Sequence, residues 1–195
     1  MKNRTYEETL PDNYEEVLTI DCADKKTMTK INVLCVILTV AVLVISSAII
    51  LSGSRAGLSP VPISHFMIFA AAAIAYIFLH ELTHGAVYRM MTGQKLTYGF
   101  KFPVAYCGVP DIYVYRKTAM LSLLAPFIIF TAVFLAAMVL PEHTMDRLLG
   151  AVLLATHVGG CAGDLYDAYV FMTRLKDEKT LMRDFGPKQV FYLPK

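Results

Sequence analysis

The sequence predicts an all-α polytopic membrane protein with four transmembrane helices and one small β-hairpin. The 195 residues are 56% hydrophobic but only 17% charged, whereas about 25% of residues are charged in a typical soluble domain. The mean hydropathy is +0.51. Four separate apolar runs are each long enough to cross the ~30 Å hydrocarbon layer of a bilayer. A net charge of +2 without a dense basic stripe argues against a nucleic-acid-binding protein.

Taken in order, the chain divides into three predicted parts. Residues 1–30 are polar and mixed in charge, so we expect a cytoplasmic N-terminal segment. Residues 31–173 form the membrane domain, and residues 174–195 form a basic cytoplasmic tail. The first apolar run, Ile31–Leu51, has 21 residues without a charge, and Pro126 in the third run is compatible with a kinked membrane helix. The predicted spans are about 31–51, 63–91, 119–140 and 148–172.

The distribution of basic residues predicts the orientation. Lysine and arginine are concentrated in the N-terminal segment, in the 92–118 connection and in the tail. The 52–62 turn carries only Arg55, and the 141–147 turn carries only Arg147. Basic-rich segments stay on the cytoplasmic side, so we expect both termini to be cytoplasmic.

The 92–118 connection is long enough to hold structure. Alternating residues from Leu96 to Phe102 indicate a strand, Gly108–Asp111 indicates a turn, and Ile112–Tyr115 indicates a second strand. One interpretation of this predicted cytoplasmic hairpin is an aromatic belt at the membrane interface. The other is a hairpin beside an active site that pairs with an extended substrate.

The second span contains the sequence His80-Glu81-Leu82-Thr83-His84, an H-E-x-x-H motif. Spacing i, i+4 brings both imidazoles to one helical face, where they can share a metal ion. Glu81 is then placed to take a proton from a water activated by that ion. A carboxylate in a membrane helix costs about 2.5–3.5 kcal/mol even on insertion scales, which favours a functional role for Glu81.

A hydrolytic zinc site usually has three protein ligands and one open position, so a third ligand is needed. The fourth span supplies Asp164 and Asp167. At a rise of 1.5 Å per residue, His80 and Asp164 both lie about 25 Å from the outer face. Asp164 is therefore the preferred ligand, and Asp167, one turn away, is the alternative. His157 lies about 10 Å higher on the helix, so we interpret it as a hydrogen-bonded core histidine or a substrate contact.

Three motifs together resemble a known bacterial family, the putative zincin peptidases, over about residues 60–175. The motifs are His80–Gly85, Leu124–Pro126 and Gly163–Asp164. This family is distantly similar to the site-2 proteases, intramembrane zinc enzymes in which an aspartate on a later helix completes the metal site. The resemblance implies a bacterial plasma-membrane protein that binds one Zn²⁺ per chain. It implies Glu81 as the catalytic base and, as metal ligands, His80, His84 and Asp164.

The leading hypothesis is a membrane-embedded zinc metalloprotease that cleaves a membrane or membrane-associated protein near the cytoplasmic face. One alternative is a divalent-metal transporter with the histidines and aspartates as a transit site. Another is an inactive pseudoprotease that binds a partner membrane protein. Thr156 and Gly159 stand where the site-2 proteases have Asn and Pro, which keeps the pseudoprotease hypothesis open.

Overall fold

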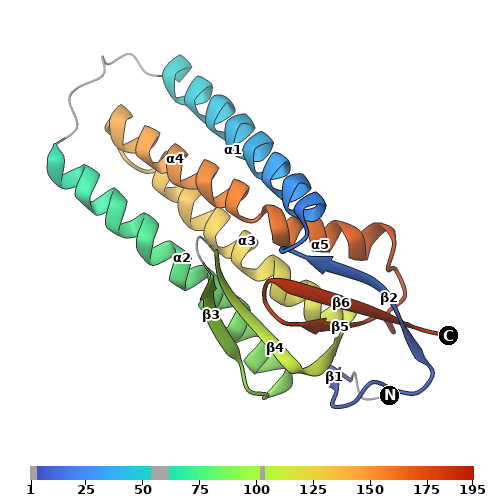
Figure 1. Cartoon of the computed structure of the whole chain (residues 1–195). Helices are drawn as coiled ribbons and strands as arrows, with labels where there is room; N and C mark the ends of the chain where they lie inside the picture. Colours follow the sequence, from blue (N-terminus) through green and yellow to red (C-terminus); the bar gives the residue numbers. More distant parts are fainter. Residues whose placement is uncertain (1–3, 54–61, 102–103) are drawn as a thin grey trace. The chain divides into compact units, whose positions relative to one another are not determined.

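The computed structural model describes residues 4–53, 62–101 and 104–195 (Figure 1). The predicted 52–62 turn therefore lies largely outside the described residues. The chain contains both helices and strands, whereas the sequence predicts helices with one small hairpin. The helices are α1 (Lys25–Gly53), α2 (Ile63–Thr92), α3 (Arg116–Val139), α4 (Thr144–Gly160) and α5 (Ala162–Thr173). The strands are β1 (Tyr6–Glu7), β2 (Tyr14–Asp21), β3 (Thr97–Lys101), β4 (Val104–Tyr115), β5 (Leu181–Asp184) and β6 (Lys188–Pro194).

The predicted all-α class is wrong, because the structure contains a six-stranded antiparallel sheet. Its order is β1-β4-β5-β6-β2, and β3 pairs with β4 outside this path. The N-terminal segment and the tail, both polar in the sequence, supply four of these strands. Tyr14 pairs with Pro194 and Thr19 with Val190, so β2 and β6 join opposite ends of the chain.

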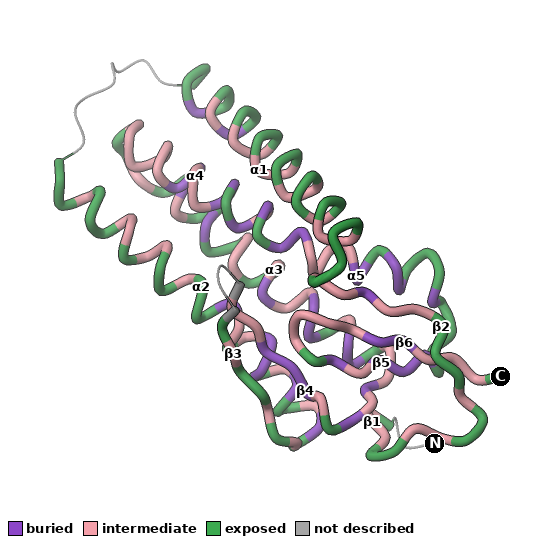
Figure 2. Tube along the Cα trace, viewed as in Figure 1, coloured by how far each residue is buried: buried purple, intermediate pink, exposed green. Residues whose placement is uncertain are grey.

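The predicted count of four continuous spans is also wrong. Three helices, α1, α2 and α3, are each long and apolar enough to cross a membrane. Only 11%, 6% and 28% of their most apolar windows are buried within the protein, so their apolar side chains face outward, as membrane association requires. Figure 2 shows this exposure along α1 and α2. The predicted fourth span is interrupted at Cys161 into α4 and α5, where Gly159, Gly160 and Gly163 weaken the helix.

A hairpin does form in the 92–118 connection, but its predicted turn is wrong. β3 and β4 pair antiparallel with Tyr98 opposite Cys107, and residues 102–103 between them lie outside the described residues. Gly108–Asp111 lies inside β4, and the register with β5 shifts between Val109 and Val114. A bulge of this kind tolerates Pro110 within a strand, which is why a turn-like sequence is extended here.

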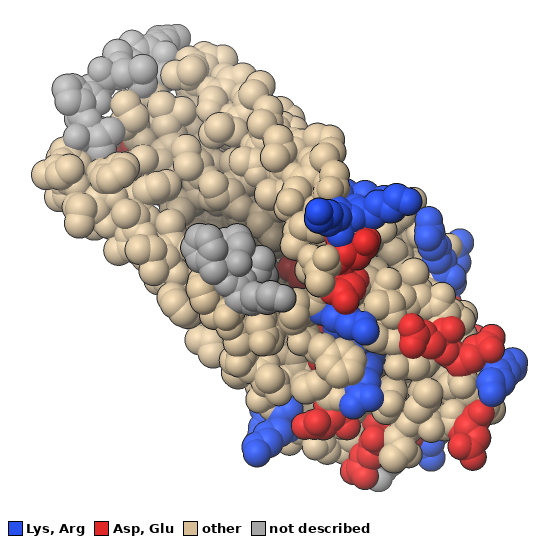
Figure 3. Space-filling view, viewed as in Figure 1, with Lys and Arg blue, Asp and Glu red and all other residues tan. Residues whose placement is uncertain are grey.

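The chain forms two compact units. The sheet unit comprises Met1–Lys30, Phe78–Pro126 and Asp164–Lys195, and the helical unit comprises Ile31–Ile77 and Phe127–Gly163. In Figure 3 the charged side chains gather over strands and helix ends of the sheet unit. The sheet unit has a core that includes Tyr88, Val114, Phe171 and Phe191, and the helical unit has one that includes Ile50, Phe134 and Leu154.

Candidate metal centre

Three side chains of the sheet unit converge on one point. His80 and His84 lie one turn apart on α2, and Asp164 lies in the first turn of α5. The Nε2 atoms of the two histidines are 3.1 Å apart. Asp164 Oδ2 lies 3.2 Å from His80 Nε2, and Asp164 Oδ1 lies 3.5 Å from His84 Nε2. The histidines are only 8% and 7% exposed, so the two imidazoles are shielded from bulk water.

These distances fit a zinc ion. At the usual bond lengths of roughly 2.0–2.1 Å, two tetrahedral ligands lie about 3.3 Å from each other. The observed separations of 3.1, 3.2 and 3.5 Å bracket that value. Two imidazoles and one carboxylate are also a donor set that zinc accepts in catalytic sites, with a fourth position left for water or substrate.

A hydrogen bond at the other nitrogen of the His84 ring also supports a metal site. His84 Nδ1 lies 2.9 Å from the backbone carbonyl oxygen of Ser122 in α3. A carbonyl can only accept, so Nδ1 carries a proton, and Nε2 is the nitrogen whose lone pair a neutral ring offers to a metal ion. The carboxylate of Asp164 is also an acceptor, so either a shared proton or a metal cation must lie between it and His84 Nε2 at this spacing. Ser122 was missed at the sequence level, because a backbone carbonyl leaves no residue-type signal.

The predicted base, Glu81, lies on α2 between the two histidines in sequence. Its carboxylate faces the backbone N–H of Cys107 in β4, so the hairpin lies beside the site. Burial raises the pKa of the Cys107 thiol to about 12. In the metal-free protein at neutral pH, Cys107 is therefore a neutral thiol.

The hairpin packs directly on the helix at Gly85, the residue after the motif. A Cβ atom at Gly85 would lie 2.0 Å from the Tyr98 hydroxyl oxygen and 3.1 Å from a methyl carbon of Leu96. Glycine at this position therefore lets β3 approach α2 next to Glu81 and His84. This contact gives a steric reason for the glycine that follows H-E-x-x-H.

The alternative third ligand, Asp167, lies outside the group of converging side chains. It lies one turn after Asp164 on α5 and is 4% exposed. In the described part of the chain, the ligand atoms that cluster with His80 and His84 within 4.8 Å come from Asp164 and not from Asp167. The geometry therefore favours Asp164.

His157 belongs to the helical unit, where it is fully buried. Its Nδ1 lies 2.7 Å from the Tyr76 hydroxyl. Its Nε2 lies 3.1 Å from the Thr131 hydroxyl and 3.3 Å from the Phe127 carbonyl. These contacts link α2, α3 and α4, so His157 is a hydrogen-bonded core histidine.

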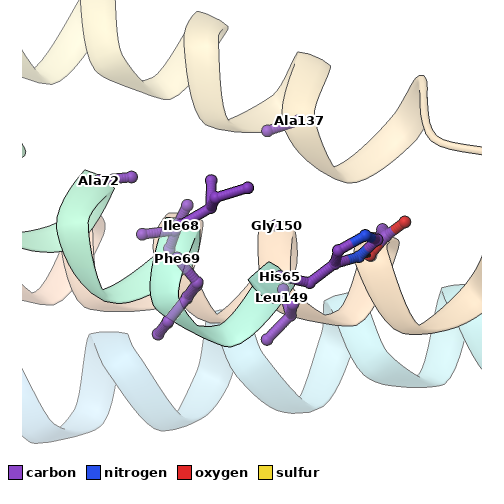
Figure 4. Close-up of a pocket in the computed structure, with 9 residues that line it drawn as sticks. His65, Ile68, Phe69, Ala72, Ala137, Leu149 and Gly150 are labelled. Carbon is purple, nitrogen blue, oxygen red and sulfur yellow. Dashed lines mark hydrogen bonds and ion pairs between the residues drawn. The ribbon is translucent and has the colours of Figure 1, made fainter. Parts of the chain in front are cut away.

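The helical unit also contains a groove of about 250 Å³ (Figure 4). His65 and Asp146 line it, with His65 Nδ1 2.8 Å from Asp146 Oδ1. The remaining lining is mainly apolar. It consists of Ile68, Phe69, Ala72, Ala137, Leu149, Gly150 and Leu153. None of the residues predicted to bind metal or act in catalysis lines this groove.

Comparison with known proteins gives one match. A family model described as "Putative zincin peptidase" matches residues 73–178, more than half of the chain. The matched range contains the H-E-x-x-H motif, Ser122 and Asp164. Neither the curated proteins nor the solved structures yield a significant match.

Proposed function

The chain belongs to the putative zincin peptidase family, and on that premise we propose that it is a membrane-embedded zinc metallopeptidase. The observation that supports this most strongly is the convergence of His80, His84 and Asp164, with ligand atoms 3.1 to 3.5 Å apart. Glu81, the acidic residue of the H-E-x-x-H motif, lies next to this group on α2.

Each residue then has a chemical task. His80, His84 and Asp164 hold the ion. When bound, zinc supplies a Lewis acid that polarises a peptide carbonyl and makes water a stronger nucleophile at neutral pH. Glu81 accepts a proton from the attacking water and delivers it to the leaving nitrogen. The Ser122 carbonyl keeps the His84 ring in the tautomer that directs Nε2 toward the ion.

The proposed substrate is a membrane or membrane-associated protein, cleaved near the cytoplasmic face of a bacterial plasma membrane. Three apolar helices support membrane association. Basic residues concentrated in the N-terminal segment, the 92–118 connection and the tail support cytoplasmic termini. Those segments supply the strands of the sheet unit, which also carries the candidate ligands.

The hairpin supports a peptide substrate. Among the described strands, β3 pairs with β4 alone, and its second edge is where an extended chain would add. Main-chain hydrogen bonds to such an edge bind a peptide with little dependence on its sequence. Tyr98 and Gly85 hold this strand against the helix that carries Glu81.

The test combines metal content with cleavage. Purified wild type, His84→Ala and Glu81→Gln are compared by mass-spectrometric zinc analysis. New protein N-termini are then counted in membranes from cells that express each form. We expect about one zinc per chain in wild type and Glu81→Gln, loss of zinc in His84→Ala, and new termini with wild type only.

The same variants, with zinc uptake into the expressing cells measured as well, separate the alternatives. Full cleavage by Glu81→Gln would contradict the proposed role of the base. Zinc without new termini in any form would favour a pseudoprotease. Zinc uptake into cells that survives Glu81→Gln but not His84→Ala would favour a transporter.

A further inference from the structure

A proline interrupts the hydrogen-bonding pattern of helix α3. α3 contains Pro126 in its interior. In an α-helix each backbone N–H binds the carbonyl oxygen four residues earlier, and proline has no N–H. The carbonyl of Ser122 therefore lacks its helical donor. A carbonyl freed in this way within a membrane helix needs another partner, because lipid offers none.

The structure contains that partner. The freed Ser122 carbonyl accepts the hydrogen bond from His84 Nδ1 at 2.9 Å. The same residue makes a second contact, in which its hydroxyl donates to the His84 carbonyl oxygen at 3.2 Å. Ser122 is 1% exposed and His84 is 7% exposed, so water does not readily replace either bond. One turn of α3 thus holds His84 at both its ring and its backbone.

We propose that Pro126 is a positioning residue of the metal centre, because it frees the Ser122 carbonyl to orient His84. This role rests on the proposed function and deepens it. A helical N–H at position 126 would compete for the same carbonyl and weaken the bond to the imidazole. The role also gives a chemical reason for the Leu124–Pro126 motif, which the catalytic mechanism does not otherwise use.

The decisive comparison replaces the proline by two residues that differ in one group. Pro126→Ala restores the N–H. Lactic acid at position 126, introduced by nonsense suppression, has the alanine side chain but an ester oxygen in place of the N–H. Zinc affinity of the full-length protein is measured in detergent by competition with a chelator, and cobalt(II) absorption reports the ligand geometry.

We expect Pro126→Ala to weaken zinc binding about 10- to 100-fold, the range found when a partner behind a metal-binding histidine is removed. The lactic acid variant should stay within a few-fold of wild type, because it also lacks the donor. The metal-free Pro126→Ala protein should be at least as resistant to thermal unfolding as wild type, because alanine is the better helix former. If Pro126 acted only on helix structure, its replacement by alanine would not lower metal affinity while leaving stability intact.

Two results would overturn the role of Pro126. One is a zinc affinity of Pro126→Ala equal to that of the wild type. The other is an equal loss in the alanine and lactic acid variants, which would assign the effect to the ring and not to the missing donor. If the alanine protein does not fold, a large loss of affinity in the lactic acid variant is itself sufficient to overturn the proposal.

His84→Ala separates this proposal from the proposed function. Zinc binding in wild type that is lost in His84→Ala, together with unchanged binding in Pro126→Ala, would overturn the positioning role alone. No His84-dependent zinc binding in wild type would overturn the metal centre, and the role of Pro126 with it.

Discussion

The sheet unit and the helical unit each contain a buried histidine cluster, and the two clusters are organised in opposite ways. In the helical unit, both ring nitrogens of His157 face hydrogen-bonding partners. The Phe127 carbonyl only accepts, so Nε2 carries the proton and Nδ1 accepts from the Tyr76 hydroxyl. In the sheet unit, His84 Nδ1 donates to the Ser122 carbonyl, but its Nε2 faces other ligand atoms.

This difference shows what separates a structural histidine from a metal-binding one. A closed set of donors and acceptors holds helices together and leaves no lone pair for a ligand. Convergent acceptors such as His84 Nε2 and the Asp164 carboxylate repel one another unless a proton or a metal cation lies between them. Burial alone does not distinguish the two cases, because His157 is even more buried than His84.

The largest expected effect comes from removing a convergent ligand. Structural zinc sites bind with about 10–16 kcal/mol shared among four ligands, so losing one ligand should weaken binding by roughly a hundredfold or more. We therefore expect His84→Ala to lose zinc in a chelator competition, whereas His157→Ala keeps about one zinc per chain. Equal zinc affinity in the two variants would remove the distinction between the clusters.

The closed cluster should instead govern stability. His157→Ala leaves a cavity and removes a hydrogen-bond partner of the half-buried Tyr76 hydroxyl. We expect it to lower the free energy of unfolding by about 3 kcal/mol, measured by equilibrium unfolding in mixed micelles. Tyr76→Phe removes only the hydroxyl bond and should cost about 1 kcal/mol. Unchanged stability in both variants would mean that the network does not hold the helices together.

A buried carboxylate outside the metal centre extends the comparison to pH. Burial raises the pKa of Asp184 from 3.8 to about 6, although Tyr88 donates a hydrogen bond to it at 2.7 Å. Since the folded pKa is the higher one, folding favours the protonated form. The stabilisation is complete below about pH 4 and is lost as the pH rises through about 6.

The full size of this effect is about 3 kcal/mol, from 1.36 kcal/mol per pKa unit. It is measured as the difference in unfolding free energy between metal-free wild type and Asp184→Asn, at several pH values from 4 to 7. Asparagine does not titrate, so the difference should change across this range. Parallel curves for the two proteins would contradict the assignment to Asp184.

The parts of the fold that depend on local sequence could be predicted. Ile31–Leu51 is uninterrupted by charge, and it falls within α1. The sheet could not be predicted in this way, because its strands are short and their partners are distant. β1 has two residues, and β2 pairs with a strand about 170 residues later. Nothing near Tyr14 in the sequence indicates that Pro194 lies opposite it.

The candidate site also has features that local sequence predicts and features that depend on tertiary structure. The spacing of His80 and His84 is local, and the depth estimate brought Asp164 to the same level. The Ser122 carbonyl and the contact of Tyr98 with Gly85 depend on how α3 and β3 pack against α2. These supporting contacts come from tertiary structure, so residue types alone could not identify them.

The smallest effect is expected for a polar pair that belongs to neither cluster and is partly exposed to solvent. His65 and Asp146 line the groove of the helical unit, and their side chains are 41% and 26% exposed. Water can solvate both groups, so the pair should contribute less than about 1 kcal/mol. His65→Ala should therefore change the free energy of unfolding in mixed micelles by less than this amount and leave zinc content unchanged. If His65→Ala lowered the free energy of unfolding as much as His157→Ala does, solvent exposure would not determine how much these polar groups contribute to stability. The contrast between the two clusters would then need another physical basis.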